Sequence, residues 1–209
     1  MRKSAKCSVF RAKHKDFPEV GLIVRVYENC AVNLMNMLYL KILKHIGKKH
    51  PYIVQTWDIF KTEKNLIMVF QEYANRNDLQ QYLERSDSPG EKQICEWARE
   101  LYQAMDYLGD MGVCHRNICP KYVLLSHKDL SIRLTGFHRS ITYWNVVKDD
   151  VYRFPCLERK SKKPDFQAPE VFGNGNTEEF DPILADTWSF GAVIFFCVKK
   201  TYPYDTKVK

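Results

Sequence analysis

The stretch CHRNICPKYVLL, Cys114–Leu125, decides the fold of this chain because it opens with the triplet His115-Arg116-Asn117. Two more short motifs follow it along the chain, first Ala168-Pro169-Glu170 and then DTWSFG, which begins at Asp186. Each motif alone would be weak, because a match of three residues is common by chance. Three motifs in this order and at this spacing are specific, and together they indicate one architecture.

The segments around these motifs change along the chain from strand-like to helical patterns. The elements predicted from apolar spacing are a strand over 20–27, a helix over 33–45, strands over 52–60 and 65–74, a helix over 91–108, short strands over 122–125 and 132–134, and a buried helix over 184–198. A polar break at 75–78 separates the two parts. We therefore expect a strand-rich N-terminal lobe, residues 1–74, and a largely helical C-terminal lobe, residues 75–209.

The motifs and the order of elements resemble those of eukaryotic protein kinases, whose catalytic loop and activation segment carry similar triplets. The sequences HPYIV at His50 and YPYD at Tyr202 look most similar to calcium/calmodulin-type and testis-specific Ser/Thr kinases. The resemblance covers nearly all of the chain and implies an α+β, two-lobed kinase-like fold that lacks the family's last helices. In the family the acid at the position of Glu170 pairs with an arginine on those helices, so Glu170 is expected to lack its usual partner.

The resemblance puts unusual residues at the positions that carry catalysis in the family. The positions of the strand lysine, the helix glutamate, the catalytic-loop base, the loop lysine, the metal-binding asparagine and the metal-binding aspartate are occupied by Arg25, Tyr39, Asn117, Cys119, Tyr122 and Gly136. Phosphoryl transfer needs positioned phosphates, divalent metal and an oriented hydroxyl. Asn117 cannot accept a proton, and both metal-binding positions have lost the family's ligand. The resemblance therefore implies no functional catalytic residue and no metal site.

The nucleotide cleft of the family also has altered counterparts here. Val9, Ile23 and Leu124 fall at the roof and floor of the adenine slot, and Arg25 keeps a positive charge beside it. The three glycine-loop positions carry side chains, which would hold the backbone away from phosphates: Arg2, Ser4 and Cys7. Ile23 is larger than the usual alanine, and Gln71 and Tyr122 add polarity or bulk near the cleft. We expect weak ATP binding at best, no magnesium and no required cofactor.

The apolar framework of the family is kept where its chemistry is lost. Leu43, His115 and Phe137 match the hydrophobic spine that joins the two lobes, and Glu170 and Asp186 match further structural positions. A zinc site made of histidines and cysteines is not expected, because the spacing of His115, His138, Cys114 and Cys119 does not resemble a zinc motif.

Composition limits the other classes of function. The net charge of +7 would admit nucleic acid or acidic lipid, but apart from the N-terminus and 158–163 the basic residues are mixed with acids. The longest apolar stretch, Phe190–Val198, is too short to predict a membrane span. Seven scattered cysteines without a Cys-x-x-Cys pair, and no secretory leader, predict reduced thiols and a cytoplasmic location.

These observations predict a catalytically inactive kinase-like protein, a pseudokinase, that acts as a scaffold or regulator. Its expected partner is a protein, either an active kinase or a substrate of one. Three alternatives stay open. The chain could be a divergent Ser/Thr kinase with weak ATP-dependent phosphotransfer that uses Lys3 or Lys6, a basic module that binds nucleic acid or acidic membrane through its N-terminal arm and Arg159–Lys163, or a truncated product with little function.

Overall fold

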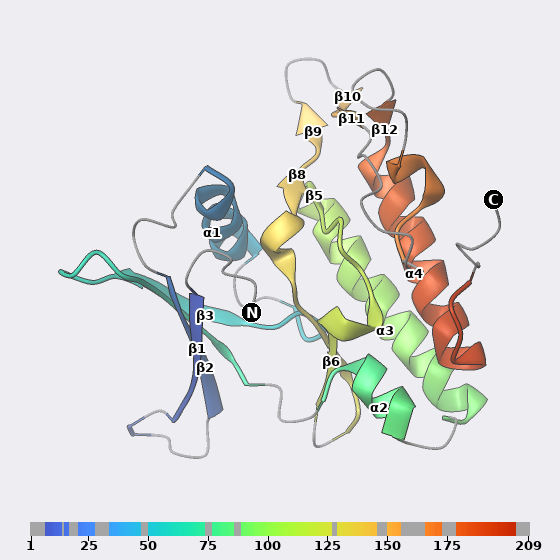
Figure 1. Cartoon of the computed structure of the whole chain (residues 1–209), viewed down its shortest axis with the longest axis horizontal. Coiled ribbons are helices and arrows are strands. Elements are labelled where there is room, and N and C mark those ends of the chain that lie inside the picture. Colours follow the sequence, from blue (N-terminus) through green and yellow to red (C-terminus); the bar gives the residue numbers. More distant parts are fainter. Residues whose placement is uncertain are drawn as a thin grey trace.

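The structure is a computed structural model, and it describes residues 7–13, 15–16, 21–27, 34–46, 50–73, 77–85, 89–126, 129–145, 150–155, 166–172 and 179–203. Its architecture is α+β, with an antiparallel sheet in the N-terminal part and a helical C-terminal part, as predicted (Figure 1). The expected boundary between residues 1–74 and 75–209 lies at 74–76, outside the described residues.

The N-terminal part is built on a four-stranded antiparallel sheet in the order β1-β2-β4-β3. Its strands are β1 (Cys7–Lys13), β2 (Gly21–Tyr27), β3 (Thr56–Lys61) and β4 (Ile67–Glu72). Val9 lies opposite Arg25, and Arg25 lies opposite Val69, so these three side chains share one face of the sheet. Val69 is fully buried, which marks this face as the inner one.

Helix α1 (Leu34–Ile46) packs beside the sheet, where the 33–45 pattern predicted a helix. Its buried side chains are Tyr39, Ile42, Leu43 and Ile46, a spacing that places them on one side of a helix. The predicted strand over 52–60 starts only at Thr56. The residues before it leave the sheet because Tyr52 O accepts a hydrogen bond from Leu134 N at 2.8 Å and Val54 N donates to Leu134 O at 2.9 Å.

The C-terminal part is organised by the helices α2 (Leu79–Arg85), α3 (Glu91–Asp110) and α4 (Pro182–Lys199). The predicted helix over 91–108 is confirmed by α3, whose buried stripe includes Trp97, Leu101 and Leu108. Gly112, just after the end of α3, has a φ of 66°, a conformation that glycine adopts without strain.

Short elements connect these helices and carry the sequence motifs. In chain order they are β5 (Val113–Cys114), the 3-10 turn η2 (Pro120–Tyr122), β6 (Val123–Leu125), β7 (Ile132–Leu134), the 3-10 turn η3 (Phe137–Arg139), β8 (Ile141–Thr142), β9 (Trp144–Asn145), β10 (Asp150–Val151), β11 (Phe154–Pro155), the 3-10 turn η4 (Pro169–Val171) and β12 (Glu179–Phe180). The antiparallel pairs are β5–β8, β6–β7, β9–β10 and β11–β12. Strands β6 and β7 lie where two short strands were predicted, and β9 to β12 lie near the first turns of α4 (Figure 1).

The predicted helix over 184–198 is confirmed by α4, but only one side of it is buried. Residues such as Ala185, Ser189 and Val193 make up the buried side. On the other side the apolar side chains are exposed: Leu184 by 63%, Trp188 by 43%, Phe195 by 39% and Val198 by 52%. The expectation of full burial was wrong because apolar composition does not tell which sides of a helix have packing neighbours.

By length and composition, α4 is the one described helix that could cross a membrane. A helix packed in a protein core passes the same test, and 44% of α4 is buried inside the structure. The length and composition of α4 are therefore equally consistent with a membrane span and with a helix packed in a protein core.

Candidate functional site

The loop that begins with His115 is fixed to α4 through a buried carboxylate. His115 N donates to Asp186 Oδ2 at 2.6 Å, and Arg116 N donates to Asp186 Oδ1 at 2.8 Å. Burial raises the pKa of Asp186 to about 7, although its two hydrogen bonds from backbone amides oppose this shift. Arg116 adopts a φ of 61°, uncommon for a residue with a side chain. Asp186 thus holds the catalytic-loop backbone in a conformation that costs free energy.

The His115 and Phe137 rings are in contact, as the predicted hydrophobic spine would need. The two rings lie 4.8 Å apart, and His115 Nε2 donates to Thr135 O at 2.9 Å. Burial lowers the pKa of His115 to about 4, so the ring is neutral at pH 7. Leu43 of α1 lies in the same core as Phe137, with only 3% and 2% of the two residues exposed. These three residues join α1 to the catalytic loop.

Tyr122 and Gly136, which the resemblance puts at two metal-binding positions of the family, lie so close together that Tyr122 occupies the space beside Gly136. Gly136 has a φ of 91°, and a Cβ atom added to it would lie 2.5 Å from Tyr122 Cγ and 3.0 Å from Tyr122 Cβ. Tyr122 is anchored by its backbone, because its N–H donates to Cys119 O and its carbonyl accepts from Thr135 N, both at 2.9 Å. The space that an aspartate side chain at position 136 needs is therefore taken by the tyrosine.

Asn117 and His138 complete this cluster. Asn117 Nδ2 lies 3.4 Å from His138 Nε2, and the Tyr122 ring lies 5.5 Å from the His138 ring. The pKa of His138 is lowered, first by partial burial and then by the positive charges of Arg139 and Arg25. A neutral His138 can accept a hydrogen bond from the Asn117 amide at pH 7.

These residues do not fit a magnesium ion. Magnesium prefers carboxylate and phosphate oxygens in octahedral geometry, whereas this cluster offers an amide, a phenol and an imidazole. In the part of the chain that the structure describes, no group of three His, Cys, Asp or Glu side chains is placed to hold a metal. We assign no chemical step to a metal here.

Arg25 has an amide as its partner where the family has a carboxylate. Arg25 Nε donates to Gln71 Oε1 at 3.0 Å, and Gln71 Nε2 donates to Thr56 Oγ1 at 3.1 Å. Tyr39, at the position of the family's helix glutamate, is buried with its ring 6.4 Å from that of Tyr27. Among the described residues no carboxylate forms an ion pair with Arg25, so its charge is held in place but not neutralised.

The residues expected at the nucleotide cleft lie in both parts of the fold. Val9 of β1 is 54% exposed and shares the inner sheet face with Arg25, as does the partly buried Ile23 of β2. Leu124 of β6 is partly buried and forms a backbone bridge with Asp78.

The remaining predicted residues lie at other places in the fold, apart from Cys119, whose carbonyl anchors Tyr122. Cys119 precedes η2 and packs against the main core, and Glu170 is exposed in η4. Cys7 is the first residue of β1. The other residues named from the sequence, Arg2, Lys3, Ser4, Lys6 and Arg159–Lys163, lie outside the described residues.

Two groups of contacts were missed from the sequence. One is the hydrogen-bonded series Thr56–Gln71–Arg25, which joins three strands. The other is the packing of the Arg116 side chain against Phe154 and Phe180. Neither has a local signal, because the partners are far apart in the sequence and meet only through strand pairing.

Comparison with known proteins agrees with this geometry. The sequence model of the protein kinase domain matches residues 9–209. The chain is 28% identical over 156 residues to testis-specific serine/threonine-protein kinase 1 of Homo sapiens, covering 75% of this chain and 41% of that protein. It is 26% identical over 167 residues to the carbon catabolite-derepressing protein kinase of Saccharomyces cerevisiae, covering 80% of this chain and 23% of that protein.

A similar match is found to CBL-interacting protein kinase 21 of Oryza sativa subsp. japonica, at 28% identity over 157 residues, which are 75% of this chain and 28% of the relative. The chain thus spans less than half the length of these relatives. Because the domain model covers nearly the whole sequence, the chain belongs to the protein kinase family. Its similarity to the Ser/Thr kinases named above is distant.

Proposed function

We propose that this protein is a catalytically inactive member of the kinase family, a pseudokinase that acts by binding a signalling protein. The observation that carries the proposal is the packing of Tyr122 against Gly136, where a Cβ atom would come within 2.5 Å of the tyrosine. Loss of one metal ligand could be repaired by a nearby carboxylate. Here the space itself is filled, so no side chain at position 136 can reach a metal without moving Tyr122.

The electrostatics of the site support the same proposal. Phosphoryl transfer depends on a base, on metal ions and on an ion pair that positions the phosphate-binding lysine. Asn117 faces a histidine, and Arg25 is held by the neutral Gln71 amide. Loss of a general base alone costs about 10²- to 10⁴-fold in rate, and the metal-binding positions are changed as well.

The experiment that tests the proposal has two parts. Thermal unfolding of the purified chain is measured with and without millimolar ATP, each with and without magnesium. Transfer of labelled phosphate to the chain itself and to a generic basic protein is measured in parallel, with Asn117→Ala as the control. We expect no stabilisation that requires magnesium, since a ligand stabilises a protein only by binding its folded state. We also expect no transfer above that of the control.

The divergent-kinase alternative makes the opposite prediction. Magnesium-dependent stabilisation by ATP, together with phosphate transfer that is lost in Asn117→Ala, would overturn the proposal. Stabilisation by ATP in EDTA, without transfer, would agree with an inactive protein that keeps a weak, metal-independent nucleotide cleft around Arg25.

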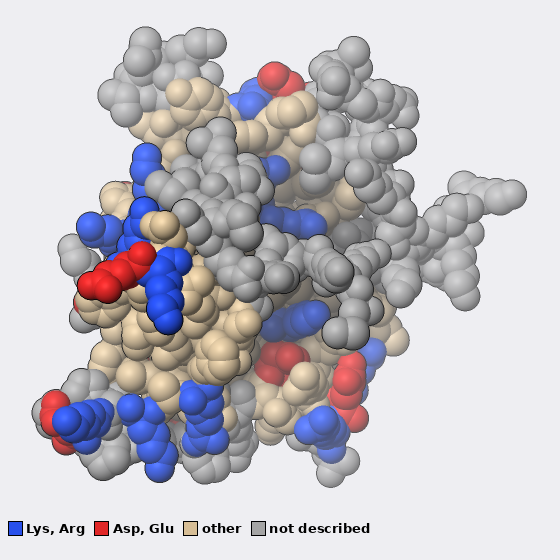
Figure 2. All heavy atoms as spheres, turned by 60° about the vertical axis from the view of Figure 1, so that its left-hand side comes forward, with Lys and Arg blue, Asp and Glu red and all other residues tan. Residues whose placement is uncertain are grey.

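A protein partner in the cytoplasm is the interaction that we propose, rather than nucleic acid or an acidic membrane. On the face shown in Figure 2, the described Lys and Arg side chains lie in several separate places with a broad uncharged area between them. Binding to nucleic acid usually involves clustered cations and weakens steeply with salt. Partner capture that persists between 50 and about 200 mM salt would support a protein interface, whereas a steep loss would favour the basic-module alternative.

A further inference from the structure

The Arg116 side chain packs against two aromatic rings that come from different strands. Its Cζ atom is 5.0 Å from the centre of the Phe154 ring and 5.9 Å from that of Phe180. Phe154 of β11 and Phe180 of β12 are direct partners across this antiparallel pair, with ring centres 6.5 Å apart. Residues 154 and 180 are the two ends of one segment, and the β11–β12 pair brings these ends together. We call the paired ends the base of the segment, and Arg116 packs against this base. We refer to Arg116, Phe154 and Phe180 as the aromatic clamp.

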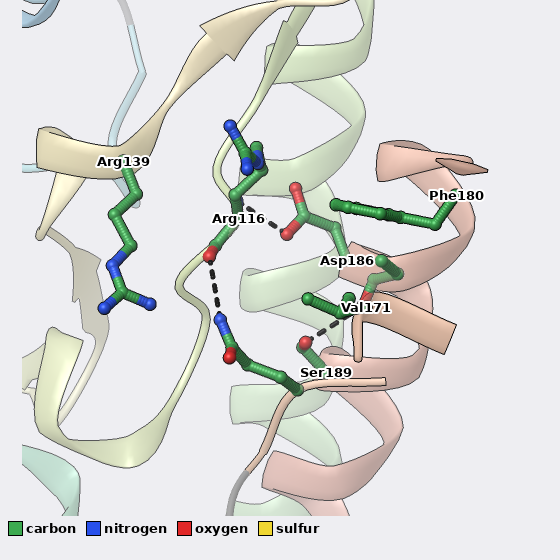
Figure 3. Close-up of a pocket in the computed structure, with 8 residues that line it drawn as sticks. Arg116, Arg139, Val171, Phe180, Asp186 and Ser189 are labelled. Carbon is green, nitrogen blue, oxygen red and sulfur yellow. Dashed lines mark hydrogen bonds between the residues drawn. The ribbon is translucent and has the colours of Figure 1, made fainter. Parts of the chain in front are cut away.

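The backbone around Arg116 is fixed independently of the clamp. Arg116 N donates a hydrogen bond to Asp186 Oδ1, and Arg116 O accepts one from Gln167 Nε2 at 3.5 Å. Figure 3 shows Arg116 and Phe180 beside Asp186 at α4, while Arg139 lies on the opposite side of the pocket.

The guanidinium is charged and largely removed from water. Burial lowers the pKa of Arg116, but an arginine stays protonated at neutral pH. Both oxygens of Asp186 already accept backbone amides. Among the described residues, no acceptor forms a hydrogen bond with the guanidinium, which packs against the two rings and also feels the negative charge of Asp186. A cation over desolvated aromatic rings is stabilised by their quadrupoles.

The clamp also joins a small apolar cluster that is separate from the main core. Its buried members are Ala168, Val171, Phe180 and Ala185, and Phe154 and Phe172 pack against them. This cluster connects the Ala168-Pro169-Glu170 motif, the start of α4 and the β11–β12 pair. The clamp adds the catalytic loop to these three elements.

In kinases whose activation loop is ordered by phosphorylation, new pairs between arginine and the phosphorylated residue hold the loop. We propose that in this protein the aromatic clamp takes that role, so that the segment between β11 and β12 is held at its base without a phosphate. This inference does not depend on whether the chain transfers phosphate.

The test uses amide hydrogen exchange on the 209-residue chain produced in bacteria, with intact mass confirming that it carries no phosphate. Amides of residues 150–154 and 179–181 report on the base of the segment, and amides of α3 report on global unfolding. Phe154→Leu keeps the apolar volume and every charge but removes one ring face. Tyr152→Leu is the matched control, because Tyr152 is 46% exposed and lies two residues away.

We expect the base of the segment to be protected in the unphosphorylated chain. Phe154→Leu should speed its exchange by roughly 5- to 30-fold, the factor that corresponds to losing a desolvated cation–aromatic contact, while Tyr152→Leu and the α3 amides stay unchanged. Fast exchange of the base in the unphosphorylated wild type would overturn the inference. Equal exchange in Phe154→Leu and Tyr152→Leu would do the same. Neither outcome touches the phosphotransfer experiment, so the two proposals fail separately.

Discussion

Gly136 gives the sharpest test of the proposed inactive site, because the neighbouring Tyr122 can be removed independently. Substitution of Gly136 by Ala adds a Cβ atom 2.5 Å from Tyr122 Cγ and 2.6 Å from its Cδ1. These atoms are near the backbone of the tyrosine, so they cannot swing away as the tip of a flexible side chain could. Overpacking of this kind costs about 1–3 kcal/mol. The left-handed φ of 91° adds about 1–2 kcal/mol for any residue with a side chain.

Gly112→Ala supplies the matched control. Gly112 also has a left-handed φ, 66°, but an added Cβ atom there would meet nothing within 4 Å. Urea unfolding should therefore show that Gly136→Ala loses about 1–3 kcal/mol more of the free energy of unfolding than Gly112→Ala does.

Tyr122→Ala should restore most of that difference when combined with Gly136→Ala, because it removes Cγ and Cδ1 and leaves only the 3.0 Å contact with Cβ. The double-mutant cycle then gives a favourable coupling of about 1–3 kcal/mol. If Gly136→Ala costs no more than Gly112→Ala, or if the cycle shows no coupling, the two positions do not exclude one another. Gly136→Asp could then rebuild a metal ligand by itself, and the proposal of inactivity would lose its main support.

Three further outcomes follow from the buried polar groups. Folding lowers the pKa of His115 from 6.5 to about 4. The free energy of unfolding of the wild type should therefore fall by about 3 kcal/mol relative to that of His115→Phe as pH falls from 6.5 to 4. Urea unfolding at each pH measures this difference. Asp186 has the opposite effect, because its raised pKa of about 7 makes the free energy of unfolding fall as pH rises from 4 to 7. Asp186→Asn should remove this pH dependence. It should also lower the free energy of unfolding by about 1–3 kcal/mol at pH 7 in the same assay, because asparagine has one carbonyl oxygen for the two backbone amides. Thr56→Val should lower the free energy of unfolding by about 1–3 kcal/mol, because it leaves the buried Gln71 amide without its acceptor. Thr62→Val, at a hairpin turn, is the control and should lower it by less, and thermal unfolding measures both variants.

The fold was predictable because its signals are local. Helix α3 follows from apolar residues at helical spacing, and its end lies beside Gly112, which takes the left-handed φ that the end of a helix often needs. The motif at His115 placed the catalytic loop, and strands β6 and β7 follow from short apolar runs around a polar turn. Local patterns failed to predict which side of α4 is buried, because apolar residues such as Leu184 and Val198 also lie on its exposed side.

The candidate site was predictable only as a set of positions. The resemblance put Tyr122 and Gly136 at two metal-binding positions of the family, but it did not show that Tyr122 occupies the space beside Gly136, because that depends on the pairing of β6 with β7. Likewise, Arg25 was recognised as a cation, while its partner Gln71 was fixed by the register of β2 against β4.

The sequence alone therefore determined the family and most of the longer elements, and it predicted which positions of the catalytic motifs carry unusual residues, because motifs and periodicity are encoded within short windows of the chain. The tertiary structure decided which of these residues touch, which side of α4 is covered, and that Arg116 packs against Phe154 and Phe180. Those features arise from contacts between segments far apart in the sequence, and strand register and packing, not local propensity, set the distances between them.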